Sequence, residues 1–296
     1  KDTKLSNGIA DLFRGEFRNY IRCVNVNYES SRNEFFYDLS LAIKGCENLE
    51  NSFKLYVAKE RLDGNNQHSA GEYGKQDADM GTEFLQLPKV LHLHLRDFDY
   101  STLRMEKVNE KFEFPKEIDL TQFVVNPGDR SFEPNRYLYD LYGILVHSGG
   151  VYGGHYYAFL RTSTNPQWYK FDDSCVTKEE TETAVQDNYG GSIYANYNPN
   201  ARTNPYSYAY QYSRMKRYSG YMLVYVRRED ADHIFQPIST NEIPQHLIDY
   251  VKQAELEAKM KKERQIEESN TLTINVISQS DLENWNLQGN FNGKAS

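Results

Sequence analysis

Alternating apolar and polar positions predict β-strands over much of the chain up to about residue 230. The segments FRNYIRCVNVNY and FFYDLSLAI, within residues 12–43, alternate with the period of a half-buried strand. The segment TEFLQLPKVLHLHLRDF is a denser apolar run, typical of a buried strand. Because Gly, Asn, Asp and Ser separate the strand segments, they predict an antiparallel sheet. The remaining strands are expected in KFEFPKEIDL, broken at Pro115, and in YLYDLYGILVHSGG, HYYAFLRT, QWYKFDDSCVT and GYMLVYVRR.

Helical spacing marks three other segments. ENLENSFKLYVAKERLDG predicts a short helix that ends at Asp63–Gly64, and KEETETAVQDNYGG predicts one helix that ends at Gly190. From about residue 241 to residue 270 we expect a long helix, whose charged run EAKMKKERQIEE is typical of a solvated connector. An Asn- and Tyr-rich insertion at residues 195–217 and the strand-like TLTINVIS after the long helix complete the pattern.

The strands and helices together place the chain in the α+β class, and its composition limits the function classes. The net charge of −8 over 296 residues argues against broad nucleic-acid binding. No run of about eighteen apolar residues exists, so no membrane helix is expected. Three cysteines without a CxxC pair argue against a disulfide scaffold and a zinc ribbon. They suit a reducing compartment, the cytoplasm or the nucleus.

The strongest candidate for chemistry is a histidine that follows a glycine-rich loop. HSGGVYGGHYYAFL places His147 and His155 at the two ends of this loop, and WYKFDD places Asp172 on the next predicted strand. Neighbouring antiparallel strands can bring such a pair together, and a carboxylate on one ring nitrogen leaves the other free as a base. The glycines allow either a tight hairpin with a structural His–Asp pair, or a bare backbone past which another chain slides to reach His155.

A nucleophile to match this base is not evident in the sequence. Cys23 lies within a strand pattern, Cys46 follows a glycine in a turn, and Cys175 lies just beyond Asp172. None of them begins a helix, whose N-terminus would lower the pKa of a reactive thiol, and no GxSxG motif is present. The sequence therefore offers a base and the residue that orients it, without the group they would activate.

The motifs LVHSGGVYGGHYYAFL, WYKFDD and GYMLVYVR resemble the histidine box and closing strands of the ubiquitin-specific proteases. TEFLQLPKVLHLHLRDF and EKFEFP resemble the leucine–proline segment and blocking loop of that family, and LFRGEFRNYIRC resembles its fingers. The pattern is most similar to the branch of the herpesvirus-associated enzyme and its fungal counterpart. The resemblance implies the palm and fingers of a papain-like cysteine protease at residues 1–232, a helical connector at 233–270 and the start of a truncated ubiquitin-like domain at 271–296.

The resemblance also implies roles for individual residues, in a deubiquitinase that hydrolyses the (iso)peptide bond after the last glycine of ubiquitin. His155 would be the general base, Asp172 would orient it, and Asp173 would be a supporting polar group. A second set would line the slot for the Gly-Gly end of ubiquitin and contact its tail: Gly153, Gly154, Tyr156, His147, Phe98, His94 and Tyr221.

The implied partners are ubiquitin and ubiquitinated proteins, an N-terminal catalytic segment that carries the cysteine, and C-terminal ubiquitin-like domains. No cofactor, metal, nucleic acid or membrane is implied. The cysteine box of the family is absent from this sequence. We therefore expect this chain alone to be inactive, and an inert ubiquitin-binding module is the alternative. A carbohydrate-binding module would explain the 24 tyrosines but leaves the histidine box without a role.

Two further departures from the family pattern qualify the resemblance. Asp97 stands where an arginine is common, and Cys23 alone remains of two metal-binding cysteine pairs. His92 and His94 share one face of a predicted strand, as two metal ligands would. A third ligand is not evident, so we expect these two histidines to be ordinary strand residues.

Overall fold

The computed structural model of the chain describes residues 7–99, 106–108, 110–125, 135–162, 166–192, 216–236, 239–270 and 279. It divides into two units, residues 1–236 and residues 237–296, which are described separately. Two predicted segments fall outside the described residues: the Asn- and Tyr-rich insertion, except for residues 216 and 217, and the strand at 271–278. No helix in the described part of the chain is long and apolar enough to cross a membrane.

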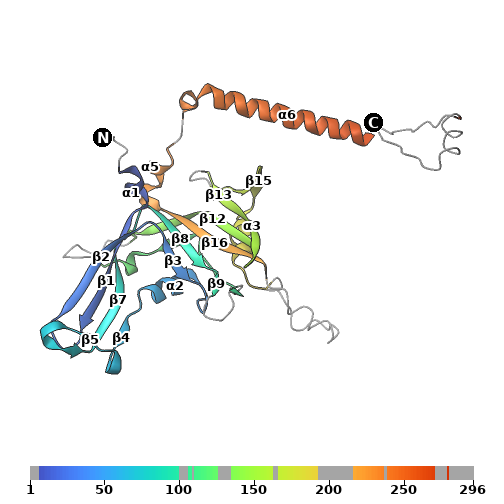
Figure 1. The fold of residues 1–296 in the computed structure, drawn as a ribbon. Coiled ribbons are helices and arrows are strands. Elements are labelled where there is room, and N and C mark those ends of the chain that lie inside the picture. Colours follow the sequence, from blue (N-terminus) through green and yellow to red (C-terminus); the bar gives the residue numbers. More distant parts are fainter. Residues whose placement is uncertain are drawn as a thin grey trace. The chain divides into compact units, whose positions relative to one another are not determined.

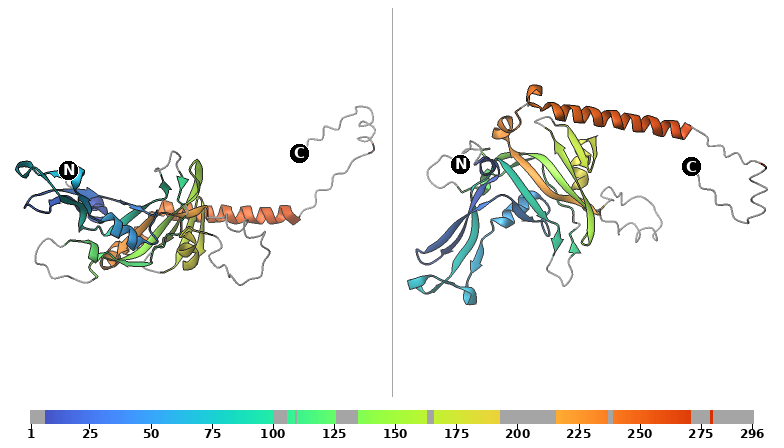
Figure 2. Two further views of the ribbon diagram at one scale, coloured as in Figure 1. Left: turned by 90° about the horizontal axis from the view of Figure 1, so that it is seen from below. Right: turned by 45° about the horizontal axis from the view of Figure 1, so that its top comes forward.

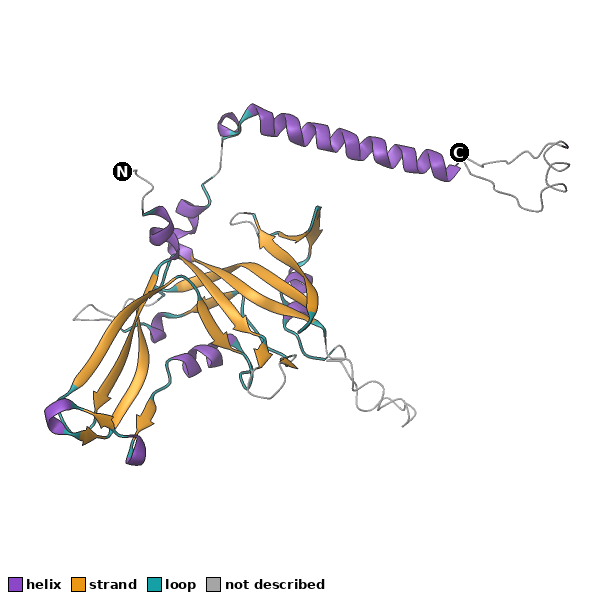
Figure 3. Cartoon of the chain, viewed as in Figure 1, coloured by secondary structure: helices purple, strands orange, loops and turns teal. Residues whose placement is uncertain are grey.

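Strands dominate the first unit (Figure 3). The larger of its sheets has eight strands, seven of them in the order β15-β14-β13-β12-β16-β8-β3, with β11 paired to β12. All neighbours are antiparallel except β3 and β8, which are parallel. The strands are β3 (Leu39–Ala42), β8 (Val90–Arg96), β11 (Glu117–Asp119), β12 (Leu138–Gly150), β13 (Gly153–Arg161), β14 (Trp168–Asp172), β15 (Cys175–Glu179) and β16 (Tyr218–Arg227).

A second, antiparallel sheet projects from the end of the larger one (Figures 1 and 2). Its strand order is β2-β1-β7-β4, and the alternation seen in the sequence pairs β1 with β2 over eight residue pairs. Short pairs β5–β6 and β9–β10 complete the strands. Their bounds are β1 (Gly15–Cys23), β2 (Glu29–Phe36), β4 (Glu60–Leu62), β5 (His68–Ser69), β6 (Lys75–Gln76), β7 (Ala78–Gln86), β9 (Phe98–Asp99) and β10 (Glu106–Lys107).

The main core lies where the larger sheet meets helix α2. Leu49 and Phe53 of α2 are fully buried with Leu91 and Leu93 of β8. Tyr225 is also fully buried, and its hydroxyl donates to the carbonyl of Pro115 at 2.7 Å, so the burial leaves no unpaired polar group there. The helices and single turns are α1 (Gly8–Phe13), α2 (Leu49–Tyr56), η1 (Gly64–Asn66), η2 (Gly71–Tyr73), η3 (Thr121–Phe123), α3 (Thr181–Ala184), η4 (Gln186–Asn188), η5 (Arg228–Asp230), α5 (Ala231–Ile234), η6 (Thr240–Glu242) and α6 (Gln245–Asn270).

Two predicted helices are wrong in extent. The first ends at Tyr56, not at Asp63–Gly64, because residues 60–62 pair with β7 instead. This pairing buries Leu62 in a small apolar cluster, which a continuing helix would leave exposed. The second prediction covered Lys178 to Gly190 and is replaced by the end of β15, by α3 and by η4.

The α3 helix is short because a side chain donates hydrogen bonds to the carbonyls of its last residues. Asn188 donates from Nδ2 to the carbonyls of Thr183 and Ala184, at 3.1 and 2.9 Å. A local side-chain bond of this kind competes with continued helix. The second unit contains α6, which confirms the predicted long helix; none of its residues is buried.

Candidate active site

The glycine-rich segment forms a tight β-hairpin between β12 and β13. Ser148 pairs with His155, Gly149 with Gly154, and Gly150 with Gly153, so only Val151 and Tyr152 lie between the strands. The loop is therefore not loose. Of the two interpretations that the sequence left open, the hairpin describes this conformation, and His155 stands close to its end.

Two of the four glycines in the hairpin are required by this packing. A Cβ atom on Gly154 would lie 2.4 Å from Nε2 of His147 and 2.7 Å from the carbonyl oxygen of Ser148. A Cβ on Gly149 would lie 2.5 Å from the carbonyl oxygen of Gly153, and its φ of +147° also favours glycine. Gly153 has open space on the same test. The surface at Gly153 is therefore free for another chain, whereas Gly154 makes room for His147.

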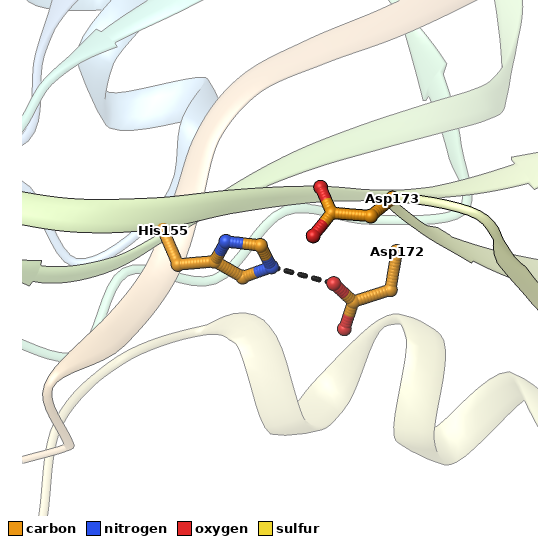
Figure 4. A group of neighbouring side chains, drawn as sticks. All are labelled: His155, Asp172 and Asp173. Atoms are coloured by element: carbon orange, nitrogen blue, oxygen red, sulfur yellow. Dashed lines mark hydrogen bonds and ion pairs between the residues drawn. The ribbon is translucent and has the colours of Figure 1, made fainter.

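His155 and Asp172 meet across β13 and β14, as the sequence predicted. Nε2 of His155 lies 2.5 Å from Oδ1 of Asp172 (Figure 4). Hydrogen bonds from Lys170 and from His155 lower the pKa of Asp172, so this carboxyl is ionised and can only accept. Nε2 therefore donates, and Nδ1 of the neutral ring carries the lone pair. The side chain of His155 is 49% exposed, so this lone pair is accessible.

The same bond sets the protonation of His155. The hydrogen bond to Asp172 raises the pKa of His155 above its ordinary value of 6.5, and Asp173 raises it further. The ring is neutral, and able to act as a base, only above that raised pKa. This arrangement can accept a proton at Nδ1 while Asp172 stabilises the imidazolium that forms.

Asp173 has a structural role besides its charge. Asp172 pairs with Cys175, so Asp173 and Ser174 form the two-residue connection between β14 and β15. Asp173 has a φ of +51°, a conformation that aspartate tolerates better than most residues. A ligand atom of each of His155, Asp172 and Asp173 lies within 4.8 Å of the others. Both oxygens of Asp172 are already engaged, by His155 and by Lys170, which favours proton transfer here over a metal centre.

The predicted tail-binding rings gather on one face of the larger sheet. The ring centroids of His94 and Tyr221 are 4.8 Å apart, those of Tyr221 and Tyr156 are 5.5 Å apart, and those of Tyr156 and His147 are 4.7 Å apart. Phe98 lies 5.8 Å from His147. A cavity of about 610 Å³ adjoins them, lined by Ala42, Ile43, Lys44, His94, Arg96, Asp97, Phe98, Val108, Tyr156 and Tyr221. His147 is buried behind Tyr156, with an exposed fraction of 3%.

Comparison with known proteins identifies the family. The sequence model of the family described as ubiquitin carboxyl-terminal hydrolase matches residues 1–225. The chain belongs to this family. It is 41% identical over 288 residues to ubiquitin C-terminal hydrolase 12 of Arabidopsis thaliana. The aligned region covers 95% of this chain and 25% of that protein.

Two fungal relatives give a similar picture. Ubiquitin carboxyl-terminal hydrolase 5 of Schizosaccharomyces pombe is 41% identical over 250 residues, covering 83% of the chain and 21% of that protein. Ubiquitin carboxyl-terminal hydrolase 15 of Saccharomyces cerevisiae is 36% identical over 290 residues, covering 94% of the chain and 23% of that protein. The chain thus spans about a quarter of the length of these curated hydrolases.

The three cysteines of the chain do not join the cluster at His155. Cys23 is buried beside Leu62 and Ala78, and Cys46 is buried in the main core. Cys175 is exposed on β15. Among the described residues, the metal-ligating and acidic side chains that gather at His155 are Asp172 and Asp173, without a cysteine.

The two histidines considered as metal ligands each pack on an aromatic ring. His92 stacks on Phe13 at 5.2 Å, and burial lowers the pKa of its ring. His94 contacts Tyr221 edge to face. In the described part of the chain neither belongs to a group of three potential metal ligands.

The sequence reasoning missed two sets of charged contacts, those of His147 and those of Asp172. Nζ of Lys107 lies 3.3 Å from Nδ1 of His147 and donates to the carbonyls of His147 and Arg217, while Oδ2 of Asp97 lies 3.7 Å from the same ring. Nζ of Lys170 lies 2.7 Å from Oδ2 of Asp172. Only the second had a signal in the sequence, since residues two apart on a strand share a face.

Proposed function

We propose that this chain supplies the general base and its orienting residue to a thiol-dependent deubiquitinase. The reaction is hydrolysis of the (iso)peptide bond after the C-terminal glycine of ubiquitin. The observation that carries the proposal is the bond from Nε2 of His155 to Asp172, which leaves Nδ1 of a half-exposed ring for proton transfer in a member of the hydrolase family. His155 takes the proton of the attacking thiol and returns it to the departing amine, and Asp173 adds a supporting negative charge.

The nucleophile, in this proposal, is a cysteine of a segment that this chain does not contain. Its support is that Cys23 and Cys46 are buried and that Cys175 does not join the cluster at His155. The proton acceptor is present without a thiol to accept from, so the isolated chain is inert. A catalytically inert ubiquitin-binding module is the second candidate, favoured by this same observation.

The ubiquitin tail, in this proposal, approaches over the exposed edge of the hairpin. Among the described residues no atom lies within 4 Å of the position of a Cβ on Gly153, and Tyr156, further along β13, is 53% exposed. The rings of Tyr156, Tyr221, His94 and Phe98 provide an apolar wall for an extended chain, and Gly154 and His147 support that wall from behind.

We further propose that the protein belongs to the branch of the herpesvirus-associated enzyme and its fungal counterpart. In that arrangement residues 1–232 are palm and fingers, 233–270 are a connector, and 271–296 begin a ubiquitin-like domain. The exposed α6 supports the connector role, because a helix without buried residues serves to span rather than to pack.

The test is labelling with ubiquitin that carries a C-terminal electrophile. The full-length protein should form a covalent adduct, and His155→Ala should reduce adduct formation on the order of 10²-fold or more, because the thiol loses its base. The isolated chain should bind the probe without reacting. Adduct formation by the isolated chain, abolished by Cys175→Ser, would contradict the proposed origin of the nucleophile. Full-length protein that binds ubiquitin but never reacts would instead establish the binding module.

A further inference from the structure

Asp172 is held at both of its oxygens. Oδ1 lies 2.5 Å from Nε2 of His155, and Oδ2 lies 2.7 Å from Nζ of Lys170. Lys170 and Asp172 are two residues apart on β14, so their side chains leave the strand on the same face. Lys170 therefore contacts the carboxylate from the same strand, at the oxygen that His155 does not contact.

Lys170 has a defined place of its own. Its ammonium lies 4.3 Å from the centroid of the Tyr157 ring on β13, a cation–π contact. Burial raises the pKa of Tyr157 to about 12, so the phenol is neutral and its ring is an uncharged platform. The ring in turn packs edge to face on the buried Phe159, with centroids 5.7 Å apart. The position of the ammonium is thus tied to the main core.

A carboxylate with one partner can turn about its last side-chain torsion, which is broad and roughly two-fold. A second bond, on the opposite oxygen and from an anchored donor, removes that freedom. We propose that Lys170 is a positioning residue: it fixes the carboxylate of Asp172 and thereby the orientation of the His155 ring. This inference rests on the proposed deubiquitinase function for its kinetic consequence, although the arrangement itself can be tested without activity.

The electrostatics of the site agree with this role. The bond from Lys170 is the largest cause of the lowered pKa of Asp172, ahead of the bond from His155. The charge of Lys170 also opposes protonation of His155, against Asp172 and Asp173. Besides Asp172, the groups Tyr218 and Asp187 raise the pKa of the Tyr157 phenol. Lys170 is therefore the cation that offsets the acidic groups facing His155.

The first test is NMR titration of the full chain, which requires no nucleophile. In Lys170→Met the side-chain length is kept and the charge is lost, so the pKa of Asp172 should rise and the Nε2–H signal of His155 should broaden or shift. Lys170→Arg restores a donor and should return both readouts toward wild type. Lys178→Met makes the same charge change at an exposed position of the neighbouring β15 strand and should change neither.

The second test is steady-state hydrolysis of a ubiquitin conjugate by the full-length protein. Lys170→Met should lower kcat several-fold with little change in KM, because the base is misaligned and ubiquitin binding is not altered. Lys170→Arg should recover most of kcat. Unchanged Asp172 and His155 signals in Lys170→Met would overturn the inference whatever the kinetics. If the full-length wild-type protein does not hydrolyse the conjugate but the NMR changes occur, the proposed function fails and the positioning role stands.

Discussion

Two histidines eight residues apart, His147 and His155, have opposite environments and opposite pKa shifts. Both stand on the β12–β13 hairpin, and both lie near an aspartate. The side chain of His155 is 49% exposed and its hydrogen bond to Asp172 raises its pKa, whereas that of His147 is 4% exposed and burial lowers its pKa. A nearby carboxylate therefore does not decide how a histidine titrates. Exposure, hydrogen-bond length and the next charge decide it together.

The largest expected effect comes from the same substitution at both positions. His155→Ala should lower hydrolysis by the full-length protein on the order of 10²–10⁴-fold, since it removes the base. It should leave the free energy of unfolding almost unchanged, because the ring is half exposed. His147→Ala should instead destabilise the fold by about 2–5 kcal/mol, the cost of truncating a large buried side chain. Kinetics and urea unfolding of both variants measure the contrast; equal losses of stability would remove the distinction.

The second effect concerns two of the four glycines between the histidines, Gly153 and Gly154. Gly154→Ala would place a methyl group 2.4 Å from Nε2 of His147, so we expect overpacking of about 1–3 kcal/mol. The shift should also displace the neighbouring His155 and lower kcat. Gly153→Ala is the matched control, because no atom lies within 4 Å of the added Cβ. It should preserve stability and raise only KM for ubiquitin conjugates. A Gly154→Ala protein as stable as wild type would show that His147 does not support the hairpin.

The sequence allowed the strands and the His155–Asp172 pair to be predicted, and it left the tight hairpin as one of two interpretations. A period of two is a local signal, and consecutive antiparallel strands are neighbours, so the pair followed from β13 and β14 alone. Helix ends were harder, because Asn188 stops α3 through its own side chain and Leu62 prefers the small cluster beside Cys23. The placement of Leu62 depends on tertiary packing, and the bond of Asn188 is a local side-chain contact that hydrophobic periodicity does not report.

The contacts of His147 with Lys107 and Asp97 could not be predicted from the sequence, for a related reason. Lys107 lies on β10 and Asp97 directly precedes β9, 40 and 50 residues before His147 in the sequence. No periodicity connects such distant residues. The contact between Lys170 and Asp172 could have been predicted, since residues 170 and 172 share a strand face. A lysine near an aspartate on a strand is, however, also typical of a solvated surface.

The third prediction concerns pH. Because the pKa of His155 is raised, its proton-accepting form is lost as pH falls through a value above 6.5, and the rate should fall with it. The contribution of His155 to the free energy of unfolding has the opposite pH dependence. This contribution is present below pH 6.5 and is lost as pH rises through the pKa of His155 in the folded protein. For His147 the folded pKa is lowered, so stability should be lost as pH falls below 6.5. Histidine NMR titration assigns the two midpoints, and a midpoint for His147 above that for His155 would contradict this assignment.

The smallest expected effect is a rise in the pKa of His147 toward that of His155. Burial is the main cause of the lowered pKa of His147, and the charge of Lys107 is the next. Lys107→Met removes that charge while Asp97 stays close, so the pKa of His147 should rise, without reaching that of His155 because the ring remains buried.

Lys116→Met, an exposed position, is the charge-matched control for this variant and should leave His147 unchanged. Lys107 also donates to the carbonyls of His147 and Arg217, so some loss of stability should accompany the shift in Lys107→Met and be absent in the control. A His147 pKa that falls or stays constant would show that the charge of Lys107 does not lower the pKa of His147.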